Sequence, residues 1–467
     1  MLKGFKKKYI GSKAFYASLM ALLIPIVVQQ GITNAASLAD NVMVGRLGTE
    51  SMSGVSIVNQ LIFVFNITVF GGLAGASIYG AQFFGKGDTD GVRYAFRFKL
   101  FYGIAIALGA MGLLYFCDDQ LISLFLTDDG SGSDLMLTLS EGKKYLHVML
   151  AGLIPFAISQ IYASSLRENG ETLSPMIASC VGIGINVVLN FILIFGYLGM
   201  PKMGVVGAAL GTVISRYIEA VYLIFRTWKQ RDKFPFIIGA FKSMHIPVNI
   251  VKNILKTGTP LIANEVLWSV GVTLITQSYS VRGLTVVASM SIATTVSNLF
   301  SIIMFSMGQA ISIMVGQLLG AGQIKRAMST DNKLIFFSIS VHVAVGIILI
   351  LVSPLIPQIY NTGADVKELA SQLLVVIGLT LPVMAYAHAT YFTLRSGGKT
   401  FITFLFDSIF TCGVPLPIAF LLCRYTALPV VVVFFFDRFS DAIKCIIGTV
   451  LLRSGVWANN IVTDENE

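Results

Sequence analysis

The chain has 467 residues, of which only 12% are charged and 55% are hydrophobic. A soluble domain carries about 25% charged residues, so this composition excludes an ordinary globular protein, and it also excludes intrinsic disorder, a collagen-like fibre and a disulfide scaffold. The formal net charge of +9 does not indicate nucleic-acid binding, because no soluble domain is expected that could carry a basic face. The expected solvent of most of the chain is a lipid bilayer.

Stretches poor in charge recur along the chain, and each is about as long as the 20 mainly apolar residues that a membrane-spanning helix needs. Six of them are 14–39, 51–85, 100–117, 146–166, 172–201 and 203–225, and six more are 257–281, 283–324, 334–364, 369–394, 400–423 and 425–452. The sequence therefore predicts an all-α membrane protein of twelve spanning helices. The predicted division is a first lobe at 1–228, a cytoplasmic connection at 229–249 and a second lobe at 250–467.

The distribution of basic residues predicts the orientation in the membrane. The first apolar stretch is too long for the core of a signal peptide, so we expect it to remain as the first spanning helix. With the N-terminus in the cytoplasm, 23 Lys and Arg residues fall on the cytoplasmic side and 7 on the other side. The positive-inside rule therefore predicts a multi-pass protein of the cell membrane with both termini in the cytoplasm.

The two halves of the chain resemble each other residue by residue. The equivalent residues and motifs are Pro25 and Pro260, Gln29 and Asn264, 80–87 and 315–322, 166–172 and 394–400, and Arg216 with Glu219 and Arg438 with Asp441. Each half holds an even number of predicted helices, so both enter the membrane in the same sense. The sequence predicts two parallel six-helix repeats around a central cleft.

Motifs for nucleotide or metal chemistry are absent from the sequence. It contains no Gly-rich nucleotide fingerprint and no HExxH motif, and its 4 histidines and 5 cysteines have no metal-ligand spacing. We therefore expect neither a metal nor another cofactor. The remaining class is a passive or ion-coupled membrane transporter rather than an enzyme or an ATP-driven pump.

The first predicted helix carries the main candidate site. An ionisable residue inside a membrane costs roughly 2.5 to 3.5 kcal/mol on insertion scales and is a functional candidate for that reason. Asp40 ends this helix, and Gln29 and Thr33 lie on the same face at helical spacing. Pro25 would bend the helix and is the candidate hinge. From the residues alone, Asp40 is either part of a site or a solvated carboxylate at the helix end.

Other polar residues in the apolar stretches have two interpretations. Asn186 and Asn190 share a helical face, where they would either serve a ligand or hold neighbouring helices together. Glu265, His388 and Asp407 are the second-lobe candidates, and each is a protonatable group or a partner for a neighbouring helix.

Two pairs of opposite charge lie within predicted helices, three residues apart. These pairs are Arg216 with Glu219 and Arg438 with Asp441. Because side chains at this spacing are neighbours on a helix, we expect the members of each pair to neutralise one another.

Several motifs, taken in order, resemble those of the multidrug and toxic compound extrusion (MATE) transporters. They are Pro25 with DNVMVGRLG at 40–48, AQFFGKGD at 81–88, LR at 166–167 with Gly170, NVVLN at 186–190, and GVVGAAL at 204–210 with SR at 215–216. The resemblance extends over nearly the whole chain. It implies a V-shaped pair of six-helix lobes that export organic, often cationic, compounds in exchange for protons or sodium ions.

The resemblance also implies roles for individual residues. It places Asp40 in the first-lobe cavity as the carrier of the coupling ion, with Asn186 and Asn190 in the same site. Members with a well-defined sodium site often have aspartate where this chain has Asn190 and a threonine near the position of Ala208. Sodium prefers charged or carbonyl oxygens, so these departures favour protons over sodium.

A second branch of the family couples through the other lobe. It carries a glutamate on the seventh helix, which Glu265 matches, and an aspartate on the tenth helix, where this chain offers only His388. The predicted function is an antiporter that acts as a monomer on small organic cations or amphipathic compounds. The alternatives are a lipid or polyprenyl-linked sugar flippase of a related fold and a major facilitator, although the acidic, arginine-rich loop typical of the latter is missing between Gly85 and Lys99.

Overall fold

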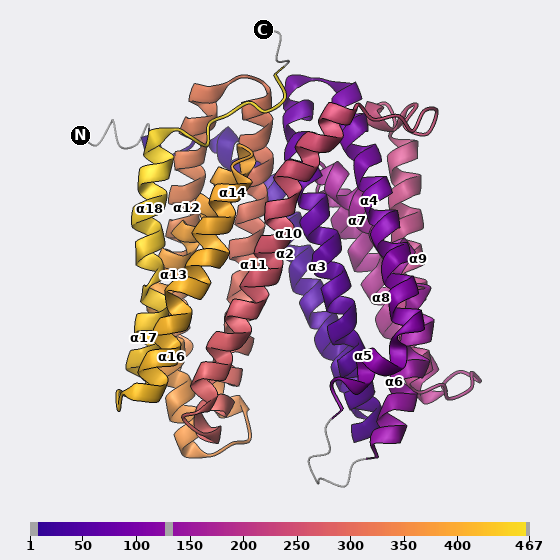
Figure 1. The fold of residues 1–467 in the computed structure, drawn as a ribbon, viewed down its shortest axis with the longest axis vertical. Helices are drawn as coiled ribbons and strands as arrows, with labels where there is room; N and C mark the ends of the chain where they lie inside the picture. Colours follow the sequence, from indigo (N-terminus) through magenta and orange to yellow (C-terminus); the bar gives the residue numbers. More distant parts are fainter. Residues whose placement is uncertain (1–7, 127–133, 464–467) are drawn as a thin grey trace. The chain divides into compact units, whose positions relative to one another are not determined.

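The computed structural model describes residues 8–126 and 134–463, and long helices dominate them (Figure 1). In the first half these are α2 (Lys13–Gly45), α3 (Thr49–Lys86), α4 (Thr89–Phe116), α5 (Asp118–Ser123), α6 (Leu135–Leu150), α7 (Leu153–Glu168), α8 (Leu173–Phe195) and α9 (Val205–Lys229). The 3₁₀ helix η1 (Pro235–Ile237) follows, and then α10 (Val248–Ser280), α11 (Leu284–Gly320), α12 (Ile324–Val352), η2 (Ile356–Ile359) and α13 (Ala364–Ser396). The last elements are α14 (Thr400–Phe404), the π-helical turn η3 (Leu405–Ile409), α15 (Phe410–Gly413), α16 (Pro415–Tyr425), α17 (Val430–Phe439) and α18 (Asp441–Ser454).

The predicted membrane-spanning segments reappear as helices. Among the described residues, 10 helices are long and apolar enough to cross a membrane, counting Thr400–Tyr425 as one. The pair α6 and α7 would make an eleventh span, bent by 48°. The twelfth predicted segment is present as α17 and α18, which are separated at Ser440 and carry the charges of that stretch.

The outward-facing residues of these helices fit a lipid solvent. Large apolar side chains such as Leu108, Ile347 and Val450 are 54%, 54% and 64% exposed. A soluble protein rarely exposes extended apolar surface, whereas helices that contact lipid do so along their length.

The described residues cluster into two compact units. We call the first, Ile24–Gly80 with Thr89–Ile254, the first-half unit. The second-half unit contains the described residues of Met1–Leu23, Ala81–Asp88 and Leu255–Glu467. The beginning of α2 and the end of α3 therefore pack with the second half of the chain.

Equivalent repeat motifs meet inside the second-half unit. A Cβ on Gly85 would lie 1.9 Å from the backbone oxygen of Gln317, and a Cβ on Gly320 would lie 1.9 Å from that of Gln82. Because these two glycines and these two glutamines are equivalent in the repeat, the contacts are reciprocal about a local two-fold axis. Only glycine lets two helix backbones approach this closely.

The C-terminal segment completes this junction. The buried Gln82 side chain donates from Nε2 to the carbonyls of Ser396 at 2.9 Å and Asn459 at 3.3 Å, and its Oε1 accepts from the Ile461 N–H at 2.9 Å. One glutamine amide therefore joins α3, α13 and the chain after α18, the segment that Figure 1 draws in yellow.

We predict that Gly85→Ala destabilises the protein by about 1 to 3 kcal/mol, because the added methyl group must displace backbone rather than a flexible side chain. The measurement is the midpoint of thermal unfolding in detergent. Gly109→Ala is the matched control, since a Cβ there would meet nothing within 4 Å. Equal midpoints for the two variants would contradict the close contact.

Candidate functional site

Asp40 lies near the end of α2 in the first-half unit, where α8 supplies both of its hydrogen-bond donors. The Asn190 side chain donates from Nδ2 to Asp40 Oδ1 at 2.8 Å. With its amide turned so that both ends are paired, Asn186 donates to the same oxygen at 3.1 Å and accepts from the N–H and the hydroxyl of Thr212. The structure therefore brings Asp40, Asn186 and Asn190 together, and it adds Thr212, which the sequence did not single out.

Burial differs within this group. Asn186 and Asn190 are 5% and 1% exposed, whereas Asp40 is only half-buried and keeps access to the surroundings. The Asn190 Oδ1 atom is buried without a hydrogen-bond partner. A Cβ on Gly211 would lie 2.1 Å from this oxygen, so the absence of a side chain at Gly211 makes room for the amide.

Gln29 belongs to a separate polar chain. Its Nε2 donates to Ser179 Oγ at 2.7 Å, and its Oε1 accepts from Arg167 Nη2 at 2.9 Å. Ser179 in turn donates to Glu219 Oε1 at 2.7 Å. Among the described residues Gln29 has no hydrogen bond to Asp40, so this cluster, which we call the first-half node, is distinct from the Asp40 group.

The helical ladder of α2 is weakened at two places, one before Gln29 and one between Gln29 and Asp40. Pro25 lies inside the helix and lacks the N–H that would bond the preceding turn. Thr33 Oγ1 donates to the Gln29 carbonyl at 2.8 Å, and Ser37 Oγ donates to the Thr33 carbonyl at 3.1 Å. Such back-bonding often bends helices. The Thr33 hydroxyl is therefore hydrogen-bonded to the backbone of its own helix. The hinge at Pro25 stays a prediction.

The second-half unit holds a corresponding polar cluster. Asn264 Nδ2 donates to Asp407 Oδ2 at 3.2 Å and to the Tyr391 hydroxyl at 3.4 Å, while Ser408 Oγ donates to Asn264 Oδ1 at 2.7 Å. Lys444 Nζ pairs with Asp407 Oδ1 at 3.1 Å. We call these residues the second-half node. Asp407 lies in the π-helical turn η3, and such turns are frequent at functional sites.

The two nodes are repeats of one another. Because 166–172 matches 394–400, Ser179 stands in the same register as Asp407. The hydrogen bond between Gln29 and Ser179 is therefore repeated as the one between Asn264 and Asp407. The comparison of the two halves of the sequence paired Gln29 with Asn264 but was not extended to Ser179 and Asp407. Extending the same register to these residues would have identified the second-half node.

Glu265 and His388 are not hydrogen-bonded to the second-half node. Glu265 interacts electrostatically with Asp407 across a longer distance. The His388 ring packs against the rings of Phe305 and Phe392, with centroids 4.9 Å away in each case, and its buried Nδ1 has no partner. The structure thus places the three second-lobe candidates in one region without joining them directly.

Arg216 and Glu219 interact electrostatically, as the sequence predicts, but they do not form a contact ion pair. No salt bridge joins them in the described structure, because the Arg216 guanidinium lies 4.9 Å from the centroid of the Phe156 ring while Glu219 accepts from Ser179. An arginine stem is long enough to take an aromatic face instead of a carboxylate on its own helix.

The second predicted pair, Arg438 with Asp441, forms no salt bridge within the described part of the chain. The Arg438 guanidinium lies 5.1 Å from the centroid of the Phe434 ring. Asp441 pairs instead with Lys444, whose Nζ is 3.6 Å away.

A buried ion pair supports the first-half unit. Lys99 and Glu168 form a salt bridge with side chains 0% and 6% exposed, and Lys99 Nζ also donates to Ser165 Oγ at 3.2 Å. A Cβ on Gly80 would lie 2.0 Å from Glu168 Oε2, so glycine at this position leaves space for the carboxylate. Lys99, which the sequence assigned to a loop, is therefore an interior residue of α4.

Comparison with protein families decides the identity of the chain. The family model MatE matches twice, at residues 25–192 and 260–421, which together make up more than half of the sequence. The chain belongs to the MatE family. The two matches begin at Pro25 and Pro260, the prolines that are equivalent in the repeat, so each half of this MatE transporter carries the unit of the family.

Curated relatives share most of its length. The probable multidrug resistance protein NorM of Thermotoga maritima is 27% identical over 409 residues, covering 87% of this chain and 85% of the relative. The probable multidrug resistance protein YoeA of Bacillus subtilis is 22% identical over 425 residues, covering 89% and 88%.

Solved structures share its fold. An outward-facing multidrug resistance MATE transporter of the MOP superfamily matches with a TM-score of 0.83 and 19% identity over 94% of this chain and 96% of that one. A MATE in the bent conformation gives 0.84 and 20% over 94% and 95%. A MOP superfamily transporter from Pyrococcus furiosus, described as having a binding pocket of reverse polarity, gives 0.81 and 20% over 94% and 95%. The predictions of an all-helical multi-pass membrane protein and of MATE membership are confirmed.

We predict that Lys99→Met destabilises this transporter by about 3 to 5 kcal/mol, because it leaves the Glu168 carboxylate buried without its partner. Thermal unfolding in detergent is the measurement. The double variant Lys99→Met/Glu168→Leu removes both charges and should recover most of the loss. A double variant no more stable than the single one would contradict the claim that loss of the Lys99 partner at the buried carboxylate causes the destabilisation.

Proposed function

We propose that this MatE transporter exports organic cations or amphipathic compounds in exchange for protons, and that Asp40 is the residue at which the two compete. The observation that carries the proposal is the arrangement around Asp40, a half-buried carboxylate with two amide donors on one of its oxygens. The curated relatives named as multidrug resistance proteins support the substrate class.

The free oxygen of Asp40 suggests how the competition works. Asn186 and Asn190 both donate to Oδ1, and Oδ2 accepts no hydrogen bond from a described residue. A cationic substrate is attracted to the ionised carboxylate, and a proton on Oδ2 removes that charge. Drug and proton therefore exclude one another at Asp40. With access alternating between the two sides of the membrane, this exclusion is enough to drive them in opposite directions.

The small number of available side-chain oxygens, Asp40 Oδ2 and the unpartnered Asn190 Oδ1, supports protons rather than sodium. Sodium, as a hard cation, needs several oxygen ligands around it. The Asn186 and Asn190 nitrogens face Asp40, while the Asn186 oxygen is engaged by Thr212. Ala208 offers only its backbone carbonyl, which already accepts from Thr212 Oγ1 at 3.0 Å. Two side-chain oxygens are fewer than a hard cation needs, so this group is a poor sodium site.

The charge of the site argues against the flippase alternative. An anionic lipid or polyprenyl-linked sugar would need a cationic cavity. The ionisable group at the first-half site is a carboxylate, which favours cations. Transfer of fluorescent anionic lipid between leaflets by the purified protein, without any dye transport, would favour the flippase instead.

We predict that Asp40→Asn folds normally but loses dye export driven by a pH gradient, because the amide has the same size and cannot exchange a proton. The measurement is export of a cationic dye from liposomes at fixed membrane potential, with a pH gradient or a sodium gradient imposed alone. The expected rate for Asp40→Asn equals that of empty liposomes.

Glu265→Gln is the matched control for this experiment, since it makes the same chemical change in the other unit. It should retain most of the export driven by the pH gradient. Export driven by sodium alone, lost in Glu265→Gln and kept in Asp40→Asn, would overturn both the choice of ion and the choice of site.

The orientation of the chain is a separate prediction. Ser243 lies in the exposed loop after α9, and Met200 lies in the exposed connection between α8 and α9. We predict that a cysteine at Ser243 is protected from an impermeant thiol reagent in intact cells, whereas a cysteine at Met200 reacts. The background is a variant without the 5 native cysteines. The reverse labelling pattern would invert the topology.

A further inference from the structure

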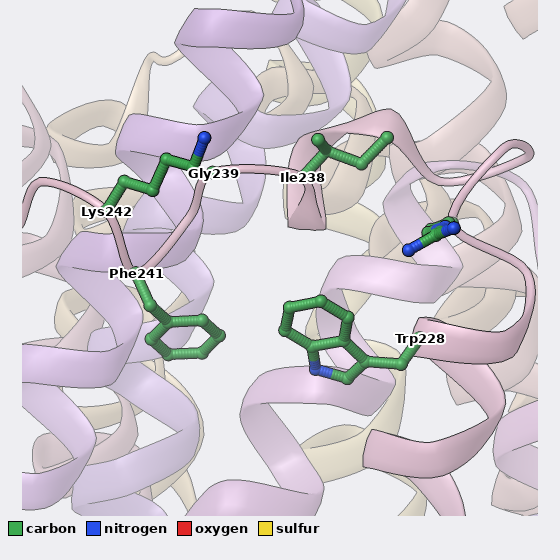
Figure 2. Close-up of a pocket in the computed structure, with 6 residues that line it drawn as sticks. Trp228, Ile238, Gly239, Phe241 and Lys242 are labelled. Carbon is green, nitrogen blue, oxygen red and sulfur yellow. The ribbon is translucent and has the colours of Figure 1, made fainter.

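A pocket of about 600 Å³ lies in the loop that follows α9, in the first-half unit and apart from the Asp40 group. Its lining residues are Trp228, Arg231, Ile238, Gly239, Phe241 and Lys242. Figure 2 shows the rings of Trp228 and Phe241 on opposite sides of the open space, with Ile238 and Lys242 on the loop that bounds it. The exchange mechanism makes no use of these residues.

Hydrogen bonds to α4 hold this loop in place. The Arg97 guanidinium donates to three of its carbonyls, those of Gly239 at 2.9 Å, Ala240 at 2.8 Å and His245 at 3.0 Å. Arg93 donates to the carbonyl of the buried Phe236 at 3.3 Å. The walls of the pocket are therefore set by backbone hydrogen bonds, and the pocket exists before a ligand arrives.

The apolar walls lie where a membrane helix ends. Trp228 is in the last turn of α9, a helix that meets the length and composition of a membrane span. The Trp228 and Phe241 rings are nearly parallel, at 14°, with centroids 6.3 Å apart, and they are 42% and 48% exposed. Aromatic side chains at this level of a helix favour the boundary between headgroups and acyl chains.

Two cations face the same space. Arg231 and Lys242 line the pocket, and neither forms an ion pair with a described residue. Lys233, by contrast, is already paired with Glu171, and Asp232 is not among the lining residues. Unpaired basic side chains beside exposed aromatic rings complement a group that is anionic at one end and apolar at the other.

We propose that this pocket binds the headgroup of an anionic phospholipid in the adjoining leaflet. Arg231 and Lys242 receive the phosphate, while Trp228, Ile238 and Phe241 contact the glycerol and the first acyl carbons. The volume is in the range of sites for small molecules and exceeds what an inorganic phosphate alone would fill. The lipid would thus fix the connection between α9 and α10 to the membrane surface, whether or not Asp40 carries the exchange.

Quenching of tryptophan fluorescence by brominated lipids tests this proposal on the full-length purified protein. We expect brominated phosphatidylglycerol to quench at a lower mole fraction than brominated phosphatidylcholine. The difference should be about 10-fold or more, given two basic residues at the headgroup level. Trp228→Phe should remove the part of the quenching that differs between the two lipids, because Trp228 is the pocket residue among only three tryptophans.

Matched variants separate the lipid site from general charge. Arg231→Gln/Lys242→Gln should abolish the preference for phosphatidylglycerol, and Lys252→Gln, an exposed basic residue outside the pocket lining, should keep it. Ile238→Glu adds an acidic side chain to the pocket and should also abolish the preference for phosphatidylglycerol. This variant provides an independent test if the double variant is unstable. Equal quenching by the two lipids, or a preference retained in the double variant, overturns the proposal. Loss of the signal on adding inorganic phosphate would assign the pocket to free phosphate instead.

Discussion

A polar side chain inside a bilayer must find its partner within the protein, and this constraint organises both halves of the transporter. The Gln29 amide joins Arg167 to Ser179 in one half, and the Asn264 amide joins Tyr391 to Asp407 in the other. Each node links the first, proline-containing helix of its repeat by hydrogen bonds to other helices of the same repeat.

The constraint also shows where the repeats diverge. The position equivalent to Asp40 in the second half is Ile275, so this carboxylate is not repeated there. The second-half node holds Asp407 at the position of Ser179, and Lys444 neutralises that carboxylate. A carboxylate held by a lysine gains little from a cationic substrate or a proton, whereas Asp40 has only neutral amide partners. This difference supports the proposal that exchange takes place in the first half.

Much of this architecture could be predicted from the sequence, and the exceptions have physical causes. Apolar stretches and repeat equivalences located the helices, and helical spacing brought Asn186 and Asn190 to one face. The partners of Gln29 could not be predicted. Helical periodicity indicates which residues share one face of a helix, but it does not indicate which neighbouring helix that face contacts. Arg216 and Glu219 form no contact ion pair for a related reason, since an aromatic ring distant in sequence competes for the guanidinium.

The central claim is that a proton and a cationic substrate exclude one another at Asp40. The most direct test is the release of protons when substrate binds to the purified protein in weakly buffered detergent, followed with a pH indicator on either side of neutral pH. The account predicts that the wild type releases protons on binding, and that Asp40→Asn binds more weakly and releases none. Equal proton release by Asp40→Asn and the wild type would contradict it.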